Sequence, residues 1–179
     1  MRLAAAVIAA AVVVAPRNPS VCTTVSDDGS HVFFSTSESL VSGDTDTDED
    51  IYERSAGLTT LPAAGSNSAY RSISSDGTQL FVVTGESLAA TDTDSAADVY
   101  RFSGGTPIQQ SIGSSGGNDN LGNATFNKNS SDGSRVFFTT ADRLEPNDVD
   151  SAADIYERFI DLPGVKSIER IAKINPARS

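Results

Sequence analysis

Residues 130–158, SSDGSRVFFTTADRLEPNDVDSAADIYER, have two earlier copies in the same chain. The copies read SDDGSHVFFSTSESLVSGDTDTDEDIYER at residues 26–54 and SSDGTQLFVVTGESLAATDTDSAADVYRF at residues 74–102. Their starts lie 48 and then 56 residues apart. A period of this length indicates a repeat architecture, in which each unit buries its hydrophobic faces only against its neighbours. We therefore look for function in what the copies share.

Each copy is predicted to be a small antiparallel sheet. Apolar residues come in short runs between polar turns, as at residues 70–74, 80–84, 99–102 and 106–111, and no window before residue 161 has a sustained helical period. The Asp-Gly pair in each copy is typical of a hairpin turn. Val32, Phe33 and Phe34 are consecutive apolar residues, so both faces of this strand must be covered. The sequence thus predicts sheets stacked face to face, in three four-stranded units at about residues 21–63, 69–111 and 124–160.

These motifs resemble a known repeat. Ser-x-Asp-Gly, an apolar strand and then Asp-Ile/Val-Tyr are similar to the TolB-like propeller repeat, a relative of the WD-repeat blade. The resemblance covers roughly residues 21–159 and implies an all-β, propeller-type fold with three recognisable four-stranded blades, as a partial or open propeller. The chain departs from that pattern at Asp27, Ser75 and Ser131, where the family often has proline. Propellers serve enzymes, receptors and scaffolds alike, so the resemblance carries fold rather than function.

Composition limits the partners. The chain has 179 residues, a net charge of -11 and 38% hydrophobic residues, as expected of a globular protein with an acidic surface. Nucleic acids and anionic membranes both require a basic surface, so we expect neither as a partner, whereas a divalent cation fits. The single cysteine, Cys22, excludes an intrachain disulfide and a thiolate metal cluster.

Residues 1–20 have the pattern of an export signal. A basic residue precedes a small-apolar run at residues 3–15, which is too short to span a bilayer as a mature helix. Residues 12–15 also occupy the place of an outer strand in an earlier, truncated blade, and this alternative stays open. Export predicts a secreted, periplasmic or cell-surface protein with no stable membrane insertion after signal removal.

Residues 161–179 leave the repeat pattern. Apolar residues at 165, 168, 171 and 174 predict a short C-terminal amphipathic helix, and the positive charge of this tail would suit docking on the acidic blades. The alternative is that the native chain continues into further blades.

An acidic bend, Asp-x-Asp-x-x-x-Asp, precedes the Tyr strand of every copy. Ca²⁺ takes six to eight oxygen ligands, and alternate carboxylates on a tight loop can converge on one ion. The alternative is that these side chains make Asx turns in a solvated loop. The first copy has an extra acidic residue, Asp48, which favours it. The predicted calcium ligands are Asp44, Asp46, Asp48, Asp50, Asp92, Asp94, Asp98, Asp148, Asp150 and Asp154.

Other candidates fit structural roles better than catalysis. His31, the only histidine, aligns with Gln79 and Arg135, as expected of a solvent-facing strand position. No Gly-x-Ser-x-Gly nucleophile elbow is predicted, because the one match to these letters, residues 113–117, lies in a Gly/Ser/Asn-rich loop and not between a strand and a helix. Glu38 and Glu86 could serve as a glycosidase carboxylate but recur with the repeat. The repeated tyrosines, Tyr52, Tyr100 and Tyr156, are predicted to pack inside the blades with their hydroxyls hydrogen-bonded, and Cys22 to be a buried apolar group.

The sequence therefore predicts an exported, non-catalytic propeller-type interaction module, with no catalytic or organic cofactor site and with loops stabilised by calcium. The partner is an unidentified protein or small ligand. One alternative is the propeller portion of a larger, prolyl-oligopeptidase-like hydrolase, separated from its catalytic domain; another is a purely structural surface protein. Closed propellers have four or more blades, so three blades also predict self-association, an open stack, a fragment or a fourth blade built from the termini.

Overall fold

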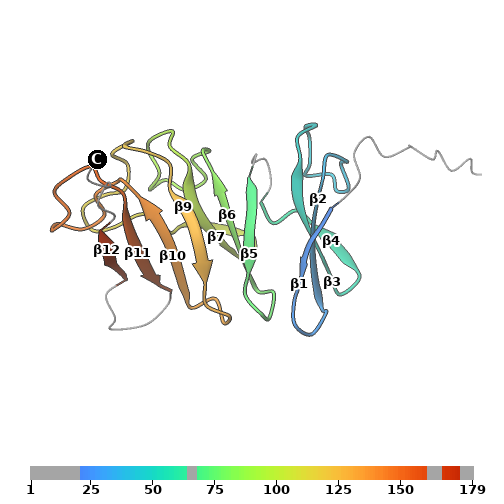
Figure 1. Ribbon diagram of the computed structural model, residues 1–179. Helices are drawn as coiled ribbons and strands as arrows, with labels where there is room; N and C mark the ends of the chain where they lie inside the picture. The colour runs from blue at the N-terminus through green and yellow to red at the C-terminus, as the bar shows by residue number, and fades with distance from the viewer. Residues whose placement is uncertain (1–20, 64–67, 161–166, 174–179) are drawn as a thin grey trace, which may run out of the picture.

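The computed structural model describes residues 21–63, 68–160 and 167–173, and every regular element in these ranges is a strand (Figure 1). Three separate four-stranded antiparallel sheets follow one another along the chain. Blade 1 has β1 (Val21–Val25), β2 (His31–Thr36), β3 (Asp50–Ser55) and β4 (Leu58–Thr60); blade 2 has β5 (Ala69–Ile73), β6 (Gln79–Thr84), β7 (Asp98–Ser103) and β8 (Thr106–Gln109); blade 3 has β9 (Thr125–Asn129), β10 (Arg135–Thr140), β11 (Asp154–Phe159) and β12 (Ile168–Lys173). Among the described residues, no helix is long and apolar enough to cross a membrane.

The Asp-Gly turns form as the sequence predicts. Gly29, Gly77 and Gly133 have φ values of 74°, 73° and 71°, a conformation that glycine adopts without the steric cost of a Cβ. In the third turn, Asp132 accepts a hydrogen bond from the amide of Ser134 at 3.0 Å and another from the hydroxyl of Ser130 at 2.6 Å. The same bonds recur at the other two turns. These bonds lower the pKa of Asp132 to about 2.

The sheets stack face to face, as the runs of consecutive apolar residues predict. Phe81 and Val99 of blade 2 pack against Val136 and Phe138 of blade 3 in one core. The opposite face of blade 2 packs on Phe33 and Ile51 of blade 1 in a second core. The first strands β1, β5 and β9 lie next to one another along the stack, and each has a bulge at the equivalent place. The sheets therefore have the radial order of a propeller, with the first strand of each blade innermost.

A row of backbone hydrogen bonds joins the blades. The amide of Asp27 donates to the carbonyl of Ser75 at 2.8 Å, and the amide of Ser75 donates to the carbonyl of Ser131 at 2.6 Å. These are the positions at which the related repeat often has proline, which carries no amide proton. The departure noted in the sequence therefore creates a link between neighbouring blades.

The helix predicted near the C-terminus is wrong. Residues 168–173 form β12, which pairs antiparallel with β11 and completes blade 3. Glu169, Ile171 and Lys173 alternate along β12 on an exposed face, as in a strand. Apolar residues that recur every three positions gave the sequence the look of a helix instead. Blade 3 thus extends into the predicted tail. The signal-like segment 1–20, with its alternative of an earlier strand, lies outside the described residues.

Candidate cation-binding loops

The repeated tyrosines anchor the acidic bends. Tyr100 is completely buried, its hydroxyl donates to Asp92 Oδ2 at 2.6 Å, and it accepts from the amide of Leu88 at 3.2 Å. Tyr52 bonds Asp44 and Tyr156 bonds Asp148 in the same way. Burial and the neighbouring carboxylate raise the pKa of Tyr52 to about 12, so the hydroxyl stays a donor. The first Asp of each bend is therefore held by the blade itself, and the predicted role of the tyrosines is confirmed.

The second Asp of each bend makes an Asx turn. Asp94 Oδ1 accepts from the amide of Ala96 at 2.7 Å, Asp46 Oδ1 from that of Asp48 at 2.9 Å, and Asp150 Oδ1 from that of Ala152 at 2.9 Å. Each turn uses one carboxylate oxygen and curls the loop back toward the strand. The alternative of loop-forming Asx turns is thus correct for this position.

The third Asp begins the Tyr strand and is buried in all three blades. Asp98 is only 2% exposed; its Oδ1 accepts from the hydroxyl of Ser111, while its Oδ2 has no hydrogen-bond partner. Burial, followed by the charges of Asp92 and Asp94, raises the pKa of Asp98 to about 7. Burial and the three upstream carboxylates raise the pKa of Asp50 to about 6. A buried carboxylate oxygen without a donor is costly unless a proton or a cation compensates it.

Blades 1 and 2 gather the three carboxylates of each bend. Oxygen atoms of Asp44, Asp46 and Asp50, and likewise of Asp92, Asp94 and Asp98, lie within 4.8 Å of one another, so each set could hold a metal ion. The predicted ligand Asp48 is exposed and lies outside the blade 1 group. The carboxylates of blade 2 are more buried than those of blade 1, and the preference for blade 1 as the calcium site stays a prediction.

In blade 3, basic side chains of the chain itself lie against the same carboxylates. Arg170 Nη1 lies 2.9 Å from Asp154 Oδ2 and 3.4 Å from Asp148 Oδ1, and Lys173 pairs with Asp150. Both bases come from β12, where Arg170 is paired in register with Tyr156. In blade 2 the residue at that register is Gln109. The prediction of a helix for this segment is the reason that sequence reasoning missed both residues.

A loop before blade 3 covers the blade 2 bend. Asn118 accepts from the amide of Thr93 at 2.9 Å and donates to the carbonyl of Thr91 at 3.0 Å, and Asn123 accepts from the amide of Ala97 at 2.9 Å. Side chains of this loop therefore hold the bend by hydrogen bonds to its backbone. This cover explains why Asp92 is buried while Asp44 is only half-buried.

The remaining candidates have structural surroundings. His31 is half-buried rather than fully solvent-facing, and its Nδ1 lies 2.5 Å from Glu53 Oε1. Glu38 contributes its backbone carbonyl, which accepts from the hydroxyl of Tyr52 at 3.0 Å. Cys22 lies in β1, but its side chain is outside the described part of the chain.

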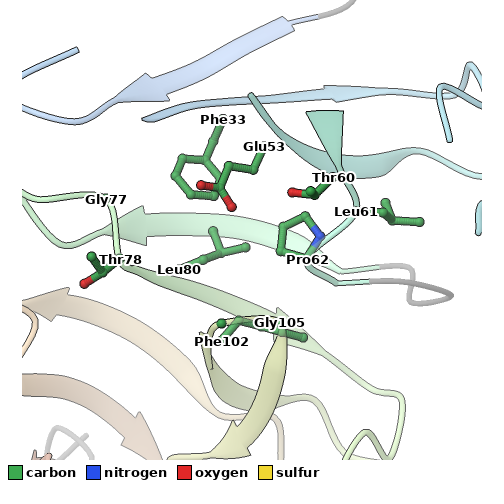
Figure 2. Close-up of a pocket in the computed structure, with 11 residues that line it drawn as sticks. Phe33, Glu53, Thr60, Leu61, Pro62, Gly77, Thr78, Leu80, Phe102 and Gly105 are labelled. Carbon is green, nitrogen blue, oxygen red and sulfur yellow. The ribbon is translucent and has the colours of Figure 1, made fainter. Parts of the chain in front are cut away.

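A cavity of about 300 Å³ lies between blades 1 and 2, at the end of the sheets that carries the Asp-Gly turn of blade 2 (Figure 2). Phe33, Leu80 and Phe102 line its apolar part, and Glu53 and Thr78 contribute polar groups. Such a cavity could take a small apolar group.

Solved structures share this fold. TolB from Acinetobacter baumannii is 15% identical with a TM-score of 0.47, and the match covers 87% of this chain and 32% of that one. A putative TolB from Agrobacterium tumefaciens is 17% identical with a TM-score of 0.50, covering 83% of this chain and 44% of that one. No family model and no curated protein matches the sequence. The chain thus has the TolB-like propeller fold predicted from its repeats, and it spans less than half the length of these structures.

Proposed function

We propose that this chain is an exported, non-catalytic propeller-type interaction module whose acidic bends in blades 1 and 2 bind Ca²⁺. The fold supports the module, because propellers present loops and inter-blade cavities on a rigid stack. The roles found for the buried tyrosines and for the Asx-turn aspartates are structural, which supports a scaffold over an enzyme. The propeller portion of a larger hydrolase stays the alternative prediction.

The observation that carries the calcium proposal is the unpartnered Oδ2 of Asp98. It is buried beside Asp92 and Asp94 and makes no hydrogen bond, although the Gln109 side chain opposes part of the rise in the pKa of Asp98. In blade 3, Asp148 Oδ1 and Asp154 Oδ1 also have no hydrogen-bond partner, but Arg170 and Lys173 place two positive charges against the bend. Blade 3 thus acts as an internal comparison: there the chain itself supplies cations to the bend, and in blades 1 and 2 a cation from solution takes that role.

Calcium fits the donors better than other common ions. All the side-chain donors are carboxylate oxygens, which hard cations prefer, and the irregular bends tolerate the variable coordination of Ca²⁺. The bound ion would supply positive charge that keeps Asp98 ionised and the bend closed. Its role is stabilisation of the loops from which a binding surface is built.

Isothermal titration and thermal unfolding with CaCl₂ test the proposal. We expect two calcium ions per chain and a higher melting temperature, with affinity in the submillimolar to millimolar range usual for extracellular sites. The variant Asp98→Asn removes one charge with little change in shape and should lose the blade 2 ion. The matched variant Asp154→Asn in blade 3 should leave calcium binding unchanged. Absence of heat and of any melting-temperature change at millimolar calcium would refute the proposal.

A further inference from the structure

In the part of the chain that the structure describes, aromatic residues on the two outer faces of the stack are partly exposed, whereas their equivalents at the inner junctions are buried. Phe138 of blade 3 is completely buried against blade 2, in a stacked pair with Tyr156. Phe34 makes the same stacked pair with Tyr52 on the outer face of blade 1, yet it is partly exposed. At the other end, Phe137 of blade 3 is partly exposed, whereas its equivalents Phe33 and Phe81 are buried against the following blade.

The two open faces are of opposite kinds. Each inner junction joins the face that carries Phe33 or Phe81 to the face that carries Val82 or Phe138. The open face of blade 3 is of the first kind and that of blade 1 is of the second. A second copy can therefore place its blade 1 on blade 3 with the same packing that already joins the blades.

The backbone row continues in the same direction. At the inner junctions, the amides of Asp27 and Ser75 donate to the carbonyl at the same position of the following blade. The amide of Ser131 occupies the donor position at the open face of blade 3, and the carbonyl of Asp27 occupies the acceptor position at the open face of blade 1. A blade added after blade 3 would extend the row by one bond.

The glycines of the Asp-Gly turns lie close to the preceding blade wherever a preceding blade is present. A Cβ on Gly77 would lie 2.5 Å from His31 of blade 1, and a Cβ on Gly133 would lie 3.2 Å from Gln79 of blade 2, so each turn lies under a side chain of the preceding blade. Nothing lies within 4 Å of the equivalent position on Gly29. The residue of blade 3 that corresponds to His31 and Gln79 is Arg135, whose side chain is half exposed and pairs with Glu157 at 3.1 Å.

Charge at this open position is complementary. Arg135 is the only arginine of its set, and Gly29 follows Asp27 and Asp28, where the other copies have one Asp. In a second copy placed by the geometry of the inner junctions, Arg135 would cover Gly29 and lie beside both carboxylates. Opposite charges at a junction favour this pairing and fix its orientation.

We propose that two copies of this chain associate head to tail, blade 3 of each on blade 1 of the other, to close a six-bladed propeller. Two junctions are formed, each burying Phe34 of one copy and Phe137 of the other. Six blades lie within the four to eight of closed propellers. The association does not require calcium, although Tyr52 joins Phe34 to the blade 1 bend through its hydrogen bond to Asp44.

Sedimentation and light scattering of the full chain, with CaCl₂ and with a chelator, test the proposal. We expect a dimer in both conditions that weakens with salt. Phe34→Glu and Phe137→Glu each disable one face, so each variant alone should be a monomer, because every junction needs both faces. A mixture of the two variants should regain dimers, since the intact blade 3 of one chain fits the intact blade 1 of the other.

The matched control is Leu58→Glu, which places the same charge at an apolar residue that is 68% exposed and belongs to neither set of buried phenylalanines. It should remain a dimer. Far-ultraviolet circular dichroism verifies that each variant is folded. A wild-type chain that stays monomeric at its highest soluble concentration overturns the proposal, and so does a mixture of the two Glu variants that stays monomeric while the wild type dimerises.

Discussion

Single carboxylates in this protein differ in what they do, although the repeat makes them look alike. Asp132 in the exposed hairpin turn accepts several hydrogen bonds, which lower its pKa to about 2. Asp98 at the start of a buried strand has a pKa raised to about 7, mainly by burial. Hydrogen bonds stabilise the charged form, whereas desolvation disfavours it. The same residue type therefore contributes opposite pH dependences at the two ends of a blade.

At this scale we predict that the calcium-free protein loses stability between about pH 4 and pH 7. Asp98 and Asp50 have folded-state pKa values of about 7 and about 6, above the ordinary 3.8. In this window the folded state therefore binds more protons than the unfolded state, and the free energy of unfolding falls as the pH rises. Urea unfolding between pH 4 and pH 8, in the presence of a chelator, measures this free energy of unfolding.

Two changes should flatten that profile. The variant Asp98→Asn removes the carboxyl group with the larger pKa shift. Calcium binds the ionised carboxylates and so offsets the stability that is lost when they ionise. The exposed turn carboxylates act in the opposite direction only below pH 4, where protonation removes their hydrogen-bonding advantage. A profile that rises from pH 4 to pH 7 would contradict the burial of Asp50 and Asp98.

At the scale of elements, strand β12 makes blade 3 differ from blades 1 and 2. The strand pairs with β11 and places Arg170 and Lys173 against Asp148, Asp150 and Asp154. The outer strands β4 and β8 are shorter, and at the equivalent register β8 has an uncharged glutamine. Basic side chains of the chain itself thus lie against the acidic bend of this blade.

We predict that Arg170→Gln destabilises the protein by roughly 2 kcal/mol, because Asp148 and Asp154 are then buried without a compensating charge. The replacement is the residue that blade 2 has at this register. Calcium should partly restore the stability and bind with a stoichiometry one higher than in the wild type. Urea unfolding and calorimetry measure both effects. Glu169→Gln, an exposed neighbour on the same strand, is the control and should have little effect.

At the scale of the whole molecule, stability comes from junctions between sheets, because no single sheet covers its own two apolar faces. Among the described residues, blade 2 is covered on both faces, whereas blades 1 and 3 are covered on one. Repeat arrays of this kind gain stability from each interface between neighbours. Equivalent residues should therefore differ in energetic weight according to which junction covers them.

Phe138→Ala should cost roughly 3–5 kcal/mol, as expected for a buried aromatic residue at an inner junction. Phe34→Ala should cost only about 1 kcal/mol in dilute protein, since its ring is partly exposed. Chemical unfolding of both variants compares two residues that stack on equivalent tyrosines, Tyr52 and Tyr156. Equal costs at low protein concentration would contradict the unequal cover of the two faces.

The repeats by themselves determined the strands, the Asp-Gly turns and the stacked blades. The repeat period, the turn residues and the consecutive apolar positions are local features of the sequence, and they recur in every copy. They also predicted the acidic bends and the packing of the tyrosines. Only the tertiary structure decided which carboxylates are compensated. That outcome depends on Arg170 and Lys173, which lie on a strand of ambiguous periodicity, and on the loop that buries the blade 2 bend. Burial and charge pairing arise between segments distant in the sequence, so the pattern within one copy does not contain them.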